Sequence, residues 1–81
     1  MKTIKASEIL ESNTFLTPAI LDYYKFYAVD KSGFVGIYRQ KPDEGEKSWI
    51  PTSPYLCAYH GFKRTVNWKE SLREIDHENN S

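Results

Sequence analysis

The densest run of apolar positions falls in two neighbouring stretches, residues 24–29 and 34–39, which are rich in aromatic and β-branched residues. This composition is typical of β-strands. The segment between them, residues 30–33, has Asp30 at its first position and Gly33 at its fourth. That is the pattern of a type I turn followed by a left-handed glycine in a bulge. The pattern therefore predicts a β-hairpin with a three-residue loop.

The turn fixes a register, and the register sorts the side chains of the hairpin onto two faces. In this register Asp30 faces Phe34, Val29 pairs with Val35, Tyr27 with Ile37, Phe26 with Tyr38, and Lys25 with Arg39. The first face holds Tyr24, Phe26, Ala28, Phe34, Gly36 and Tyr38. The second face holds Tyr23, Lys25, Tyr27, Val29, Val35, Ile37 and Arg39. We expect the first face to be core, and the second to be half core and half surface.

Two short helical segments are predicted before the hairpin. Ser7 is a suitable N-cap for a short N-terminal helix that ends near Asn13. Proline is favoured at the first position of a helix, so Thr17 followed by Pro18 predicts a second turn over residues 18–23.

The segment after the hairpin, residues 41–47, is a polar and acidic loop. Trp49 then begins a short third strand, because Pro51 cannot donate a hydrogen bond to a neighbouring strand. Residues 55–59 have the composition of a fourth strand, which Gly61 ends.

A C-terminal helix is predicted from two signals. Asn67 and Glu70 stand three positions apart, as in a capping box. Trp68, Leu72 and Ile75 recur at helical spacing.

Together these elements predict one α+β domain over residues 1–76, followed by a frayed polar tail over residues 77–81. We expect a small antiparallel sheet of three or four strands in meander order, with a short N-terminal helix and a C-terminal helix. A chain of 81 residues has a thin core. The predicted core is Ile9, Leu10, Phe26, Ala28, Val35, Ile37, Trp49, Leu56, Trp68, Leu72 and Ile75.

Composition and charge narrow the functional classes. Eleven basic and eleven acidic residues give a net charge of zero, which argues against a general nucleic-acid binder. Aromatic residues make up 15% of the chain, and they suit either a thin core or a binding surface. The single cysteine, the charged N-terminal segment and the lack of a long apolar run predict a cytoplasmic protein without a signal peptide or membrane span.

Few residue types that carry out chemistry are available. Cys57 and His60 stand three positions apart, which in a strand places them on opposite faces, and His77 is distant in sequence. A structural zinc site needs four nitrogen or sulfur ligands, more than these residues supply. Cys57 is therefore expected to pack as a small apolar residue. We predict no enzyme activity, no metal site and no cofactor.

One group of side chains combines aromatic rings with cations: Tyr23, Lys25, Tyr27 and Arg39 on the second hairpin face. Three interpretations stay open. The group resembles a protein-binding surface, in which Tyr and Arg carry much of the affinity. It also resembles a platform on which single-stranded nucleic acid stacks. Alternatively, helices cover this face and the two cations extend from its rim. Tyr23 and Tyr27 are the tyrosines we associate with function, and Tyr24 and Tyr38 those we associate with folding.

The aromatic hairpin ends at Lys41-Pro42 and is followed by the acidic loop, Trp49 and the closing segment Asn67-Trp68-Lys69-Glu70-Ser71-Leu72. This order resembles small accessory proteins of bacteriophages and prophages, in which an acidic or amide residue followed by Trp-Lys-x-Ser-Leu commonly closes the chain. The likeness covers about residues 23–75 and assigns no functional residue.

The resemblance implies a non-enzymatic protein that acts in the bacterial cytoplasm. Such proteins often bind a host protein, including host defence machinery, and redirect or inhibit it. A nucleic-acid-binding module and a structural subunit of a homo-oligomer or virion are the alternatives.

Overall fold

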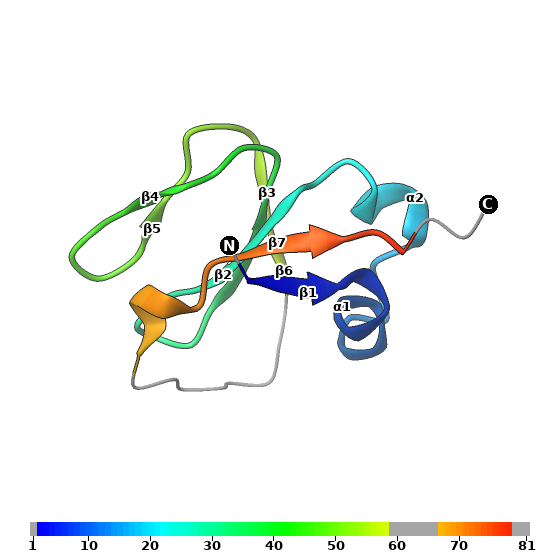
Figure 1. Ribbon diagram of the computed structural model, residues 1–81, viewed down its shortest axis with the longest axis horizontal. Coiled ribbons are helices and arrows are strands. Elements are labelled where there is room, and N and C mark those ends of the chain that lie inside the picture. Colours follow the sequence, from blue (N-terminus) through cyan, green and yellow to red (C-terminus); the bar gives the residue numbers. More distant parts are fainter. Residues whose placement is uncertain (1, 59–66, 79–81) are drawn as a thin grey trace.

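Five strands form the central sheet of the computed structural model, which describes residues 2–58 and 67–78. They are β1 (Thr3–Lys5), β2 (Phe26–Val29), β3 (Val35–Tyr38), β6 (Tyr55–Ala58) and β7 (Arg73–Asp76). Their order across the sheet is β1-β7-β2-β3-β6, with β1 parallel to β7 and the other neighbours antiparallel (Figure 1). The α+β class is confirmed. The predicted three- or four-stranded antiparallel meander was wrong, because the sheet is larger and mixed.

The β2–β3 hairpin has the predicted register, with Phe26 opposite Tyr38 and Val29 opposite Val35. Its turn is also as predicted, since the Gly33 N–H donates to the Asp30 carbonyl at 2.9 Å and Gly33 has a φ of 94°. Glycine adopts this left-handed conformation without steric cost because it has no Cβ.

The predicted pairing of Lys25 with Arg39 was wrong. The Lys25 N–H donates to the Tyr38 carbonyl, and the Arg39 N–H donates to the Pro54 carbonyl just before β6. The ladder therefore shifts at this end of the hairpin, because β7 and β6 approach β2 and β3 from their outer sides and take over the backbone groups there.

The predicted C-terminal helix was also wrong. Only a single 3-10 turn, η1 (Trp68–Glu70), forms, and the side chain of Asn67 makes no capping hydrogen bond. β7 follows and inserts between β1 and β2, where the Ile75 N–H donates to the Lys25 carbonyl at 2.7 Å. A short isolated helix is marginal in water, whereas a strand in this place is hydrogen-bonded on both sides. Leu72 and Ile75 consequently pack on opposite faces of the sheet.

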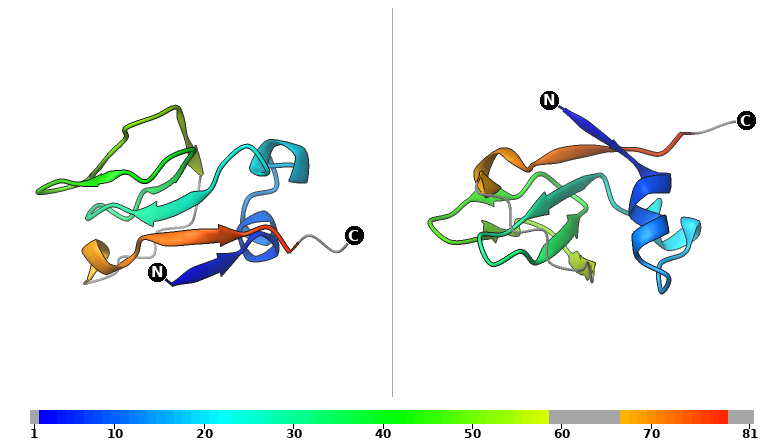
Figure 2. Two further views of the ribbon diagram at one scale, coloured as in Figure 1. Left: turned by 45° about the horizontal axis from the view of Figure 1, so that its top comes forward. Right: turned by 90° about the horizontal axis from the view of Figure 1, so that it is seen from below.

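Two short helices precede β2: α1 (Ala6–Ser12) and α2 (Pro18–Leu21). Ser7 lies inside α1 rather than at its N-cap, since β1 leads directly into the helix at Lys5. The cap of α2 is as predicted, with the Thr17 hydroxyl accepting from the Ile20 N–H at 3.3 Å, although the helix ends at Leu21. Figures 1 and 2 show both helices at one end of the sheet.

The expected third strand does not join the main sheet. β5 (Trp49–Ile50) pairs with β4 (Asp43–Glu44), which forms within the acidic loop, as a separate two-stranded sheet. β6 takes the place beside β3, as the antiparallel partner of that strand. This confirms the predicted fourth strand over residues 55–58, while residue 59 and Gly61 lie outside the described residues. β4, β5 and η1 lie at the end of the sheet away from the helices (Figure 2).

Buried side chains form two clusters. The aliphatic core consists of Ala6, Ile9, Leu16, Leu21, Val29, Val35, Ile37 and Ile75. The aromatic core consists of Ala28, Tyr38, Trp49 and Trp68. Every predicted core residue belongs to one of these clusters or packs against it half-buried, as Leu10, Leu56, Phe26 and Leu72 do. The two clusters take alternate residues of β2 and β3, so both faces of the hairpin contribute to core. The expectation that the whole first face is core was wrong for Phe34, which is 56% exposed beside the turn, and for Tyr24, which precedes β2 and packs against the aliphatic core.

The boundary between the domain of residues 1–76 and a tail of residues 77–81 stays a prediction. Two residues of that tail nevertheless make defined contacts. His77 Nε2 lies 2.7 Å from the Tyr24 carbonyl, and His77 Nδ1 lies 3.2 Å from Asp22. Glu78 accepts from the N–H and the hydroxyl of Ser7 at 3.2 and 2.8 Å. In the described part of the chain, no helix has the length and apolar character that a membrane crossing requires.

Candidate functional site

Two of the predicted site residues form an ordered pair on the surface. The Arg39 Cζ atom lies 3.8 Å from the centroid of the Tyr23 ring, and Arg39 Nη1 donates to the Tyr23 hydroxyl at 2.8 Å. Tyr23 is 57% exposed, and Arg39 is exposed as well. Tyr23 follows α2 and Arg39 follows β3, so the fold brings together side chains that are distant in sequence.

The neighbours of the Tyr23–Arg39 pair hold it in place. The rings of Tyr23 and Tyr24 meet edge to face with centroids 5.8 Å apart, and Tyr24 packs against the aliphatic core. Among the described residues, no carboxylate forms an ion pair with Arg39. A guanidinium has five N–H donors. Arg39 therefore keeps donors for an acceptor from outside the chain, while its position is fixed by Tyr23.

Lys25 is not part of this pair. Its side chain is exposed, and within the described residues it makes no hydrogen bond or ion pair with Tyr23 or Arg39. Its backbone N–H donates to the Tyr38 carbonyl, and its carbonyl accepts from the Ile75 N–H.

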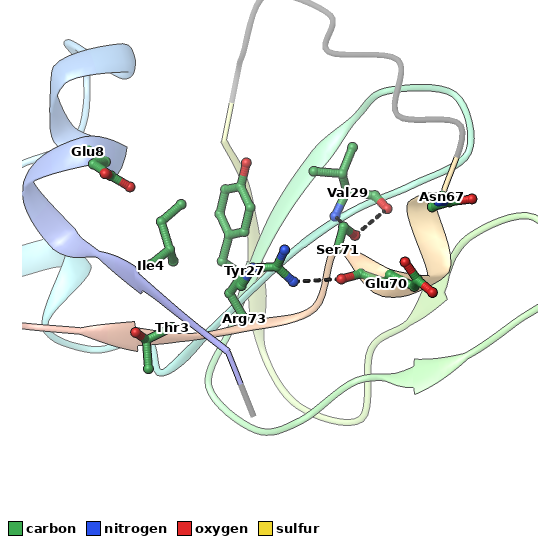
Figure 3. A pocket seen from close by; sticks show the side chains of 9 residues that line it. All are labelled: Thr3, Ile4, Glu8, Tyr27, Val29, Asn67, Glu70, Ser71 and Arg73. Atoms are coloured by element: carbon green, nitrogen blue, oxygen red, sulfur yellow. Dashed lines mark hydrogen bonds between the residues drawn. The ribbon is translucent and has the colours of Figure 1, made fainter.

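Tyr27 lies in a different place, the Tyr27 groove, which Figure 3 shows. The groove has a volume of about 400 Å³ and runs between β1 and α1 on one side and η1 on the other. Tyr27 of β2 pairs with Arg73 of β7, and the Arg73 side chain lies beside the Tyr27 ring (Figure 3). The Glu8 side chain of α1 lies on the other side of the Tyr27 ring (Figure 3). The remaining lining residues are Thr3, Ile4, Val29, Asn67, Glu70 and Ser71.

Burial and the neighbouring charges shift the pKa of Tyr27 in the groove. Burial raises the pKa of the Tyr27 phenol, the Arg73 guanidinium partly lowers it, and the Glu8 carboxylate raises it further. A phenol with a raised pKa is a neutral hydrogen-bond donor at neutral pH. Arg73 Nη1 is itself fixed by the carbonyls of Glu70 and Leu72, at 2.6 and 3.0 Å. The groove thus offers a hydroxyl, carboxylates and one guanidinium, which suit binding rather than proton abstraction.

Arg73, Glu70 and Ser71 were missed as neighbours of Tyr27 because the segment after Asn67, up to Ile75, was expected to be helical. No alternation of apolar and polar residues marks β7, whose sequence is Arg-Glu-Ile-Asp. The pairing of β7 with β1 and β2 depends on contacts that no local pattern encodes.

The groups with nucleophilic or basic chemistry are dispersed. The Ser71 hydroxyl accepts from the Val29 N–H at 2.8 Å and lies within hydrogen-bonding distance of the Trp68 and Val29 carbonyls. Cys57 is exposed, so its expected packing as a small apolar residue was wrong. His60 lies outside the described residues. Within residues 2–58 and 67–78, no three His, Cys, Asp or Glu side chains are grouped to hold a metal ion.

No family model, no curated protein and no solved structure matches the chain. Its function must therefore be inferred from its own sequence and geometry.

Proposed function

We propose that this chain is a non-enzymatic binding protein whose Tyr23–Arg39 pair anchors a partner protein. The observation that carries the proposal is an arginine stacked 3.8 Å above a tyrosine ring that remains 57% exposed. Tyr and Arg are the residues most enriched at the energetic centres of protein interfaces. Side chains that are ordered before binding lose less conformational entropy on association.

The chemistry of the pair favours a partner with a carboxylate. Arg39 has donors left over after its bond to Tyr23 and forms no ion pair within the described residues. Hydrogen bonds from a guanidinium to a carboxylate are charge-assisted and directional. An Asp, Glu or C-terminal carboxylate flanked by an apolar group would satisfy Arg39 while covering the Tyr23 ring.

The resemblance of the sequence to phage and prophage accessory proteins supplies the biological setting of the proposal. In that setting the chain acts in the cytoplasm of a bacterial host, where it binds a host protein, such as a component of host defence, and modulates or inhibits it.

The two alternatives receive less support from the geometry. Single-stranded nucleic acid stacks on successive neighbouring rings, whereas Tyr23 and Tyr27 lie in different places here. A homo-oligomer would use an edge strand of the sheet such as β6, and light scattering at several concentrations tests it.

The direct test is capture from bacterial lysate on the immobilised protein, followed by affinity measurement with the purified partner. Tyr23→Ala and Arg39→Ala are each expected to lower the affinity at least tenfold, about 1.4 kcal/mol, as at an interface centre. Phe15→Ala is the matched control, since Phe15 is also 51% exposed but lies in the segment between α1 and α2.

Equal affinity of all three variants for the captured protein would contradict the proposal. So would salt-dependent binding to single-stranded oligonucleotides that Tyr23→Ala abolishes, because this would assign the pair to nucleic acid.

A further inference from the structure

A second hollow lies on the aromatic-core face of the sheet, where β3 and β6 meet β5. We call it the aromatic hollow. Its volume is about 370 Å³, and its lining includes Asp30, Phe34, Tyr38, Trp49, Pro51 and Tyr55. It shares no residue with the Tyr23–Arg39 pair or the Tyr27 groove.

Gly36 makes room for the hollow. A Cβ atom at this position would collide with the hydroxyl end of the Tyr38 ring, so the Tyr38 side chain can lie across Gly36 only because no side chain is present there. The ring of Tyr38 stacks on that of Tyr55 with centroids 5.8 Å apart and an angle of 22° between the planes. One wall of the hollow is therefore a stacked pair of tyrosines.

The outer rings of the hollow remain in contact with water. Tyr55 is 50% exposed and Phe34 is 56% exposed, whereas Tyr38 and Trp49 are buried. When a ligand covers exposed aromatic surface around a concave site, the burial of that surface favours binding.

The charge of the hollow is negative. Asp30 Oδ1 accepts from the Trp49 N–H at 2.9 Å, and the described hydrogen bonds leave the second carboxylate oxygen without a donor. Among the described residues, no Lys, Arg or His lines the hollow, and Asp30 forms no ion pair with any of them. The negative charge of Asp30 also acts on the Tyr38 phenol. Burial is the largest cause that raises the pKa of Tyr38, and Asp30 raises it further. A carboxylate surrounded by the faces of aromatic rings is complementary to an organic cation.

We infer that the aromatic hollow binds an arginine side chain presented by a partner protein. The planar guanidinium stacks against the exposed ring of Tyr55 or Phe34 and donates to the free oxygen of Asp30. Arginine suits this site better than lysine because it is planar, more weakly hydrated and able to stack on aromatic faces. This site goes beyond the proposed function, since it carries the charge opposite to that of Arg39 and shares no residue with the Tyr23–Arg39 pair.

The test uses the only cysteine of the chain as a reporter, because Cys57 is exposed and lines the hollow. The rate of Cys57 alkylation by iodoacetamide is measured with three blocked tripeptides at millimolar concentration: Gly-Arg-Gly, Gly-citrulline-Gly and Gly-Lys-Gly. Citrulline has nearly the shape of arginine but no charge. We expect the arginine peptide to slow alkylation at least twofold, the lysine peptide to slow it less, and the citrulline peptide to leave it unchanged.

Three variants complete the test. Asp30→Asn keeps the acceptor for the Trp49 N–H and removes the charge, so it is expected to weaken the arginine effect at least fivefold. Tyr55→Leu is expected to weaken it similarly, and Tyr55→Phe, which keeps the ring, to preserve it. If Asp30→Asn unfolds the protein, the comparison of Tyr55→Leu with Tyr55→Phe still tests the site.

Protection by the citrulline peptide equal to that by the arginine peptide would overturn the inference. So would the absence of any protection, or full arginine protection in Tyr55→Leu. Tyr23→Ala is expected to leave the protection intact, so the failure of one site can be distinguished from the failure of the other.

Discussion

The two faces of the central sheet are covered in different ways. On one face, the aliphatic core joins residues of α1, α2 and the segment between them to residues of β2, β3 and β7. On the other face, four residues form the aromatic core, and Trp49 Nε1 donates to the Val29 carbonyl at 3.0 Å while the rings of Trp49 and Trp68 meet edge to face at 5.9 Å. Burial of aliphatic surface is non-directional, whereas ring edges and hydrogen bonds require particular positions.

The difference follows from what covers each face. β4, β5 and η1 have two or three residues each, so few backbone hydrogen bonds hold them to one another. Directed side-chain contacts must then attach this cover to the sheet. We therefore expect the aromatic core to tolerate substitution less well than the aliphatic core.

The largest effect is expected from Trp49→Ala. It removes the ring that contacts Trp68 and the donor to the Val29 carbonyl, and should lower the free energy of unfolding by about 3–5 kcal/mol in urea titrations. The comparable truncation on the other face, Ile37→Ala at a position that is 0% exposed, should cost less, towards the lower end of the about 2–5 kcal/mol that buried Ile→Ala changes show. Similar losses for both would remove the distinction between the cores.

Ser71→Ala is expected to have the next largest effect. The Ser71 hydroxyl accepts from the Val29 N–H at 2.8 Å, so its removal leaves a buried donor without a partner and should cost about 1–3 kcal/mol. Ser12→Ala on α1 is the control. The hydroxyl of Ser12 donates to the Glu8 carbonyl in an exposed position, and its loss should change stability by less than about 0.5 kcal/mol. Equal unfolding midpoints for the two variants would show that η1 is not anchored by Ser71.

The smallest effect is expected in alkaline solution, and it also separates the two faces. Burial raises the pKa of Tyr38 in the aromatic core and, less strongly, that of Tyr27 beside the aliphatic core. The unfolded chain therefore releases these phenolic protons first, from about pH 10, and the free energy of unfolding falls as the pH rises further.

Each such group contributes at most about 1.4 kcal/mol per pH unit. Urea unfolding between about pH 8 and 11 should show full stability below pH 10 and a decline above it. Tyr38→Phe should reduce the slope of the decline more than Tyr27→Phe does. The reverse order would show that Tyr38 is the more solvated phenol in solution.

The β2–β3 hairpin could be predicted because its determinants are local. Asp30 and Gly33 set the turn, and the turn alone assigns Val29 and Val35 to one face and Ala28 and Tyr38 to the other. β7 could not be predicted in this way. The spacing of Leu72 and Ile75 fits one side of a helix equally well, and only the vacant position between β1 and β2 decides for a strand.

The same distinction between local and long-range determinants applies to the candidate site. Tyr23 and Arg39 were assigned to one face by the hairpin pattern, and the structure brings them together. Tyr27 was assigned to the same group, but its neighbours Arg73 and Glu8 come from β7 and α1, whose positions depend on long-range pairing. The aromatic hollow was not predicted at all, because β5 was expected within the main sheet.

The insertion of β7 between β1 and β2 has a consequence for how the protein is made. Thr3 pairs with Glu74, so the first strand has no partner until the last one has been synthesised (Figure 1). Contacts of such separation make folding slow and leave strand edges open meanwhile. A nascent chain that stalls or is cut before residue 73 would present the unpaired edges of β1 and β2 to other chains.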